Sequence, residues 1–256
     1  MGTTFRPESV STDLVELTTT LGRPELDLAI LAEGNTSELL SGTDIVVKAS
    51  GASMAGASAN DFVVTEFEPL VAMMDDPHAT QDDLTQSLLA TRPDGSAIRG
   101  SIETLIHAAV RSVAPSRFVA HTHPTALVAL LSSVHAEHAF EHFVYSDEAV
   151  VIGRPMFVPY AQPGIDLGRL FLSGLRLFVE ANDTVPSLVL LANHGIVAIS
   201  DTAEGALAVS LMANKGAVIR LHAYAAGGVS PISDESVQKY FAREDIAERR
   251  RKLSGA

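Results

Sequence analysis

Two apolar runs joined by a turn-forming triplet constrain the fold of this chain more than any other feature of its sequence. Residues 187–200, SLVLLANHGIVAIS, read as two β-strands connected by the triplet NHG at 193–195. Asn and Gly favour tight turns because both tolerate left-handed backbone conformations. Residues 117–123, RFVAHTH, predict another strand, and Pro124 suits the first turn of a helix after it. The chain therefore requires a β-sheet with connecting helices.

Helical periodicity and strand-like runs follow one another irregularly along the rest of the chain. Residues 101–115 have apolar side chains at helical spacing, and a proline closes this expected helix. We also expect helices ending near Gly22, before Pro77, over 165–181 and over 202–228, and strands near 44–48, near 61–65 and within 149–164, the last broken by prolines. Because strict βαβ alternation is absent, we expect residues 1–256 to form a single α/β domain with a mixed or antiparallel sheet.

The composition excludes several classes of protein. In the 256 residues, 31 acidic and 18 basic side chains give a formal net charge of -13, which argues against nucleic-acid binding. Cysteine is absent, so disulfides and thiolate metal sites are excluded. No apolar run reaches membrane-spanning length and no signal segment is evident, so we expect a cytoplasmic protein without membrane contact. The basic C-terminal run at 247–256 reads as a solvated helix end.

His121 and His123 lie one residue apart at the end of an apolar strand and need partners there. Successive strand side chains point to opposite faces, so the two imidazoles share one face. His194 lies in the tight turn described above, and Glu103 opens the helix before the histidine strand, where a buried carboxylate needs a cation. Three imidazoles and one carboxylate suit Zn²⁺, with Mn²⁺, Fe²⁺ or Co²⁺ as alternatives. Two core histidines bonded to carbonyl groups are the competing interpretation.

The other histidines are weaker candidates. His107 shares a helix face with Glu103, so it is either a fourth ligand or, as we expect, a supporting or surface residue. His135, His138 and His142 form a helical row among acidic residues, and we expect this row to be solvated.

Three loops rich in small polar residues expose groups that can bind an anion. They are EGNTSE at 33–38, KASGAS at 48–53 and RGSIE at 99–103, where Ser101 stands at a helix start. Backbone N–H groups and hydroxyls of such loops bind phosphate, although ordinary turns have the same composition. No Walker or G-x-G-x-x-G pattern is present, so nucleotide binding has no support.

Taken together, these motifs resemble the class II aldolase/adducin family. In order, they are GNTS (34–37), SG (50–51), SIETLIH (101–107), HTH (121–123), VPYAQPG (158–164) and NHG (193–195). Two of them, SIETLIH and VPYAQPG, are similar in sequence to the aldolase part of bifunctional rhamnulose-phosphate aldolase/dehydrogenases. We expect no dehydrogenase part in this chain. Ile102 is a departure, because fuculose-type aldolases carry a second serine there.

The resemblance implies a three-layer α/β/α sandwich around a mixed, mainly antiparallel sheet, and a homotetramer with active sites between subunits. It implies that His121, His123 and His194 bind one divalent metal, usually zinc, and that Glu103 ligates the resting metal and acts as the base. Asn35, Ser50, Gly51 and Ser101 resemble the family's phosphate-binding positions. Tyr160 resembles a tyrosine that donates a proton in a neighbouring subunit's site.

The chemistry expected from these residues is metal-dependent carbon–carbon bond cleavage or formation. The substrate is a small hydroxy-ketone or sugar phosphate, and the metal stabilises an enediolate. A decarboxylase of a 3-oxo acid and a pentulose-phosphate 4-epimerase use the same metal set, so both stay open. A non-catalytic adducin-like interaction module is a further alternative, which missing metal ligands would indicate.

Overall fold

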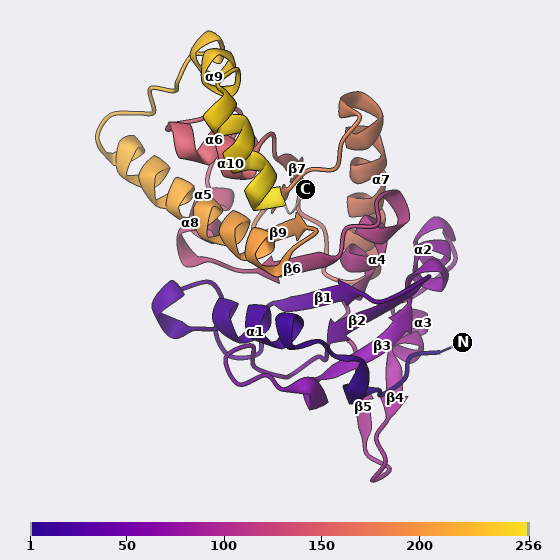
Figure 1. Cartoon of the computed structure of the whole chain (residues 1–256). Helices are drawn as coiled ribbons and strands as arrows, with labels where there is room; N and C mark the ends of the chain where they lie inside the picture. The colour runs from indigo at the N-terminus through magenta and orange to yellow at the C-terminus, as the bar shows by residue number, and fades with distance from the viewer. Residues whose placement is uncertain (1, 255–256) are drawn as a thin grey trace.

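A seven-stranded sheet forms the centre of the molecule (Figure 1), and the computed structural model describes residues 2–254, with side chains up to position 249. The strand order is β3-β2-β1-β6-β9-β8-β7, and β7 and β8 are the parallel pair in an otherwise antiparallel sheet. The strands are β1 (Asn35–Leu39), β2 (Asp44–Lys48), β3 (Phe62–Glu66), β6 (Phe118–Thr122), β7 (Met156–Val158), β8 (Leu188–Leu191) and β9 (Gly195–Ser200). The expected mixed, mainly antiparallel sheet is confirmed.

Helices cover both faces of this sheet. One apolar cluster joins one sheet face to α1 (Thr12–Leu21), α5 (Thr125–Leu131) and α8 (Ala203–Ala225). A second cluster joins the other face to α2 (Phe67–Asp75), α4 (Thr104–Val113) and α7 (Ile165–Asn182). Strand alternation explains the division, because Phe118 packs into the first cluster and its neighbour Val119 into the second. The result is the expected α/β/α sandwich.

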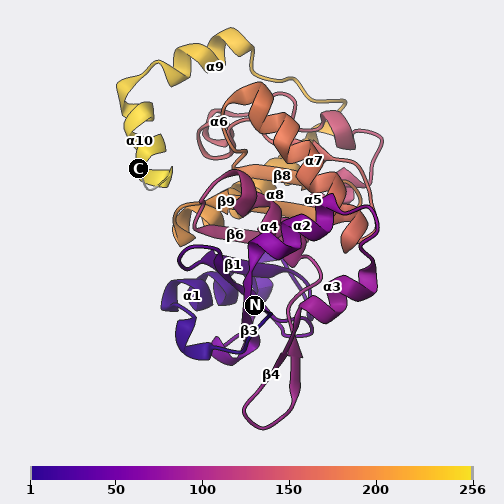
Figure 2. The same cartoon turned by 90° about the vertical axis from the view of Figure 1, so that its right-hand side faces the viewer.

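The remaining elements lie at the margins. The hairpin β4 (Leu89–Thr91) and β5 (Ala97–Arg99) follows α3 (Gln81–Ser87) and projects from the body (Figure 1). After α8, the chain continues through α9 (Asp234–Phe241) and α10 (Glu244–Ser254) along the outside of the molecule (Figure 2). Four short 3-10 helices span Pro7–Ser9, Pro24–Leu26, Ala59–Asp61 and Ala136–His138. The basic C-terminal run falls partly in α10; its side chains from 250 on lie outside the described residues.

One expected strand is wrong. Within 149–164 the structure has α6 (Ser146–Ile152) before the short strand β7. A short apolar run fits either a strand or a buried helix. Here the contacts of this segment with the rest of the molecule determine that it forms a helix. The fully buried Glu148 of α6 pairs with the fully buried Arg220 of α8, and Ile152 packs into the first apolar cluster.

The register of the central strands brings distant polar residues together. Asn35 of β1 stands opposite His121 of β6, and Thr122 stands opposite Ile196 near the start of β9. The turn between β8 and β9 therefore lies beside the end of β6. In the described part of the chain, we find no helix with the length and hydropathy that a bilayer crossing requires.

Candidate metal centre

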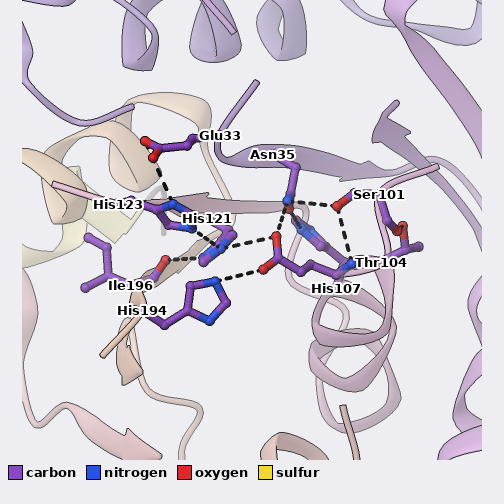
Figure 3. A network of polar contacts seen from close by, with 10 residues as sticks. Glu33, Asn35, Ser101, Thr104, His107, His121, His123, His194 and Ile196 are labelled. Carbon is purple, nitrogen blue, oxygen red and sulfur yellow. Dashed lines mark hydrogen bonds and ion pairs between the residues drawn. The ribbon is translucent and has the colours of Figure 1, made fainter. Parts of the chain in front are cut away.

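The three candidate histidines meet at the end of β6 and the β8–β9 turn (Figure 3). His121 is fully buried, and its Nδ1 lies 2.8 Å from the carbonyl oxygen of Ile196. The Nε2 atoms of His121 and His123 are 2.8 Å apart. The His194 ring centroid is 4.9 Å from each of the other two centroids. The hairpin makes this possible, because Asn193 has a positive φ of 53° and turns the chain just before His194.

Glu103 completes the group from the opposite side. It occupies the N-cap position of α4, and from this helix end its carboxylate contacts His121 and His194. Glu103 Oε1 lies 2.9 Å from His194 Nε2, and Glu103 Oε2 lies 3.3 Å from His121 Nε2. The four candidate ligand atoms, one from each residue, all lie within 4.8 Å of one another. The structure thus brings the four predicted ligands together.

The protonation of the group leaves lone pairs directed at one point. A carbonyl oxygen only accepts, so His121 Nδ1 donates its proton to Ile196, and the neutral ring has its lone pair on Nε2. That lone pair faces the carboxylate of Glu103 and the ring nitrogen of His123. Such an arrangement is repulsive unless a proton or a cation lies between the atoms.

The pKa shifts follow from this crowding. Burial opposes ionisation of Glu103, but the charges of His121 and His194 and their hydrogen bonds hold its pKa well below the ordinary value. Burial also lowers the pKa of His121, but the Glu103 charge outweighs it and raises this pKa. Burial, with the charges of His121 and His194, lowers the pKa of His123 to about 3. A carboxylate that stays anionic, with imidazole nitrogens facing it, offers a divalent cation its ligands once the protons between them leave.

A pocket opens over two of the histidines. Its volume is about 490 Å³, and Asp27, Ala29, Ile30, Glu33, His123, Thr125, Val128, Ala129 and His194 line it. Glu33 Oε2 lies 3.9 Å from His123 Nδ1, and the Asp27 carboxylate accepts a hydrogen bond of 2.9 Å from Thr125. Sequence reasoning missed Asp27, Glu33 and Thr125 as pocket residues. A larger hollow of about 760 Å³ lies between α6, α8 and α10, and none of the four candidate ligands lines it.

The predicted phosphate positions fall into two groups. Asn35 and Ser101 are buried and joined to the candidate ligands, since Asn35 Nδ2 lies 2.8 Å from Glu103 Oε2 and 3.1 Å from Ser101 Oγ. Ser50 and Gly51 are exposed on the loop after β2. The Ser50 N–H donates to the Arg99 carbonyl at 2.8 Å, which ties this loop to β5.

Tyr160 and the histidine row lie elsewhere. Tyr160 is 53% exposed in the segment between β7 and α7, and in the described part of the chain it does not line the pocket over the histidines. His135, His138 and His142 are exposed, as expected. His135 stacks on Tyr224 with ring centroids 4.1 Å apart.

Solved structures with similar folds come from several microorganisms. YgbL of Klebsiella pneumoniae, described as a putative aldolase/epimerase/decarboxylase, has a TM-score of 0.67 at 19% identity, covering 91% of this chain and 98% of that one. L-fuculose-1-phosphate aldolase of Thermus thermophilus has a TM-score of 0.59 at 16% identity, covering 86% and 97%. The N-terminal class II aldolase domain of a Thermoplasma acidophilum protein has a TM-score of 0.61 at 21% identity, covering 82% and 92%.

At these low identities, the structural similarity shows the fold alone. No curated protein sequence matches the chain. The family model "Class II Aldolase and Adducin N-terminal domain" matches residues 12–221, which is most of the chain and includes every candidate ligand. The chain therefore belongs to the class II aldolase and adducin family.

Proposed function

We propose that the protein is a metal-dependent aldolase that cleaves or forms a carbon–carbon bond in a small hydroxy-ketone or sugar phosphate. The observation that carries the proposal is the convergence of His121, His123, His194 and Glu103 on one point beside an open pocket. Class II aldolases use a divalent metal, and this donor set fits one. We further propose zinc as the resident metal, and a cytoplasmic homotetramer as the active form.

The three histidines would hold the cation, and the chain's other residues would handle protons and orientation. A bound divalent cation supplies Lewis-acid stabilisation of the negative charge that develops next to a carbonyl group. The neighbouring histidines hold Glu103 in its ionised form, which is the form that would accept a proton from the substrate. Tyr160, exposed here, would exchange a proton with the departing aldehyde oxygen in a neighbouring subunit's site.

The phosphate group of the substrate would bind between the loop after β2 and the polar residues Asn35, on β1, and Ser101, before α4. Ser50 and Gly51 are exposed on this loop. The Arg99 side chain lies 3.5 Å from Ser50 Oγ, so its guanidinium charge is next to the loop. Asn35 and Ser101 supply the deeper polar groups. Backbone N–H groups and hydroxyls of this kind bind phosphate without fixed charge, and an arginine adds to the attraction.

A decarboxylase of a 3-oxo acid is the second candidate, and one observation favours it. Ile102 packs against the second apolar cluster and provides no hydroxyl to a phosphate group. A site with fewer phosphate contacts suits a carboxylate substrate better than a phosphorylated one.

Product analysis with metal-loaded protein tests the proposal. The protein is loaded with Zn²⁺, Mn²⁺ or Co²⁺ and incubated with ketose phosphates, pentulose phosphates and 3-oxo acids. Release of an aldehyde supports the aldolase, whereas CO₂ alone or an isomer alone contradicts it and identifies a decarboxylase or an epimerase. Glu103→Gln is the matched control, because it keeps the shape and removes the base. Cleavage by this variant at the wild-type rate would show that Glu103 is not the base.

A further inference from the structure

A row of polar side chains lies between α4 and β1. Glu103, His107 and Arg111 follow one another at every fourth position of the helix, and Asn35 and Ser37 at every second position of the strand. Each step of the helix row rises about 6 Å and the single step of the strand row about 6.8 Å, so the two strand side chains can lie between successive helix side chains. His107 is fully buried and Arg111 is 4% exposed. Buried polar groups are stable only when they bond to one another.

The two rows form a continuous chain of hydrogen bonds. Arg111 lies 3.2 Å from Ser37 Oγ, which lies 2.6 Å from His107 Nδ1. His107 Nε2 is 2.5 Å from Asn35 Oδ1, and Asn35 Nδ2 is 2.8 Å from Glu103 Oε2. The hydrogen bonds therefore run without a gap from the end of α4 to the candidate metal centre (Figure 3 shows the part with Asn35 and His107).

The groups at the two ends of this row of hydrogen bonds fix which atom donates in each bond. At one end, burial lowers the pKa of Arg111 to about 9, so the side chain is still a cation at neutral pH and can only donate. Ser37 accepts from Arg111, and its own hydroxyl proton is then free for His107 Nδ1. His107 consequently carries its proton on Nε2 and donates it to the carbonyl oxygen of Asn35. Burial, with the nearby Arg111 charge, keeps the His107 pKa well below its ordinary value, so the ring is neutral.

At the other end, the Glu103 carboxylate only accepts. If Asn35 were turned over, its amide oxygen would face that carboxylate and its amide nitrogen would face the N–H of His107. Both contacts would then be repulsive. The arrangement with the Asn35 nitrogen toward Glu103 is therefore the one that avoids both repulsive contacts.

We infer that His107 is a positioning residue, which orients the Glu103 carboxylate through Asn35 while Ser37 and Arg111 set the tautomer of its ring. The inference rests on the proposed role of Glu103 in the metal centre. Glu103 has one oxygen toward His194 and the other toward His121, so a rotation of its carboxylate breaks both contacts. The hydrogen bond from Asn35 opposes that rotation. Removing a hydrogen bond that orients a metal ligand typically lowers metal affinity or activity by about 10–100-fold.

Two substitutions of His107 with side chains of similar size distinguish a role in orienting Glu103 from a role in packing alone. His107→Gln keeps an N–H that can reach Asn35, whereas His107→Met fills the same space without one. Zn²⁺ affinity is measured by competition with a chromogenic chelator, and kcat and KM are measured on any substrate found active. We expect His107→Met to lower Zn²⁺ affinity and kcat by about 10–100-fold with KM little changed, and His107→Gln to stay within about 3-fold of wild type. Equal values for the two variants would overturn the inference.

A double-mutant cycle with Glu103→Gln provides the second test. If His107 acts through Glu103, His107→Met changes Zn²⁺ affinity in the wild-type background and not in the Glu103→Gln background. Additive changes would mean that His107 is merely structural. If wild-type protein binds no Zn²⁺, the proposed function fails, and the same cycle measured by urea unfolding still decides the coupling. If His107→Met does not fold, Ser37→Ala takes its place. We expect Ser37→Ala to lower Zn²⁺ affinity by a smaller factor, and an unchanged affinity would contradict the inference.

Discussion

Arg220 and Glu148 form an ion pair that solvent does not reach. Both side chains are fully buried, and the guanidinium also donates to the carbonyl oxygens of Ala139 and His142 while its central carbon lies 3.9 Å from the Phe140 ring centroid. Replacing one partner of such a pair leaves the other charge buried and unpaired, which is far more unfavourable than losing an exposed pair.

We predict that Glu148→Leu lowers the free energy of unfolding by about 3–5 kcal/mol. The matched control is Glu235→Gln, which removes an exposed pair with Lys239 and is expected to change it by at most about 0.5 kcal/mol. Urea unfolding followed by circular dichroism measures both variants. Adding Arg220→Met to Glu148→Leu should restore part of the loss, and an equal loss in the two single variants would contradict the prediction.

Lys48 is a second buried charge, and it predicts a pH dependence. Burial lowers its pKa to about 8, although the charges of Asp61 and Glu103 oppose the shift. In the unfolded chain this lysine loses its proton only near pH 10.4. Between these two values the unfolded state binds more protons, so the free energy of unfolding rises with pH.

We predict that the free energy of unfolding of the wild type, relative to that of Lys48→Met, rises by about 2 kcal/mol from pH 7 to pH 10. The variant is the reference because other lysines and tyrosines titrate equally in both proteins. Urea unfolding at four pH values provides the measurement. A constant difference would mean that Lys48 keeps its ordinary pKa in the folded chain.

Much of the candidate site could be predicted from local sequence patterns. Strand alternation placed His121 and His123 together, and the turn chemistry at 193–195 placed His194 in a tight turn. Glu33 and Asp27 were not predictable, because their place in the pocket depends on how the loop at 27–34 folds back. The roles of Ser37 and Arg111 depend on the register of β1 with β6 and on the rotation of α4, neither of which local patterns contain.

At the level of elements, the β8–β9 hairpin tolerates little change near the site. A Cβ atom added at Gly195 would overlap the backbone oxygen of Thr122 and lie 2.7 Å from the His123 ring. The backbone of β6 cannot move away without disturbing its pairing with β1 and β9. The absence of a side chain at this glycine therefore permits the close approach of hairpin and strand.

We predict that Gly195→Ala lowers the free energy of unfolding by about 1–3 kcal/mol through overpacking and weakens Zn²⁺ binding. Gly174→Ala on α7 is the control, because a Cβ there meets no atom within 4 Å. Alanine in a helix is about 0.5–1 kcal/mol more favourable than glycine, so the control should stabilise. Thermal unfolding and chelator competition measure the two effects, and unchanged Zn²⁺ affinity in Gly195→Ala would show that the hairpin position does not matter.

The misassigned segment shows where element prediction fails. Residues 149–152 are as apolar as a strand, but the acidic pair before them lies in the first turn of α6 and Glu148 needs Arg220. That partner is far away in the sequence. Elements whose type depends on such a distant contact cannot be assigned from a short window, whereas the long helices α7 and α8 were predicted correctly.

For the whole molecule, the candidate ligands link three separate parts of the fold. Glu103 begins α4, His121 and His123 end β6, and His194 lies between β8 and β9. A cation bound to all four would hold these parts together in the folded state and find no such site in the unfolded chain. Ligand that binds only the folded state raises its stability by mass action.

We predict that Zn²⁺ at 100 times its dissociation constant raises the free energy of unfolding by about 2.7 kcal/mol. His121→Ala should remove this increase, while His135→Ala, an exposed histidine outside the site, should keep it. Urea unfolding with and without a chelator, together with metal content per chain by mass spectrometry, tests the prediction. Equal stabilisation of His121→Ala and wild type would place the bound metal elsewhere.

The position of β9 between β6 and β8 also bears on the order of events during synthesis. Glu103 and the two strand histidines leave the ribosome well before His194, since roughly ninety residues separate Glu103 from His194 and elongation adds about 5–20 residues per second. Until β9 has emerged, β6 has a free edge and the ligand set is incomplete. All four candidate ligands are therefore present in the growing chain only after residue 194 has emerged, and an ion bound by the complete set would be captured after that point.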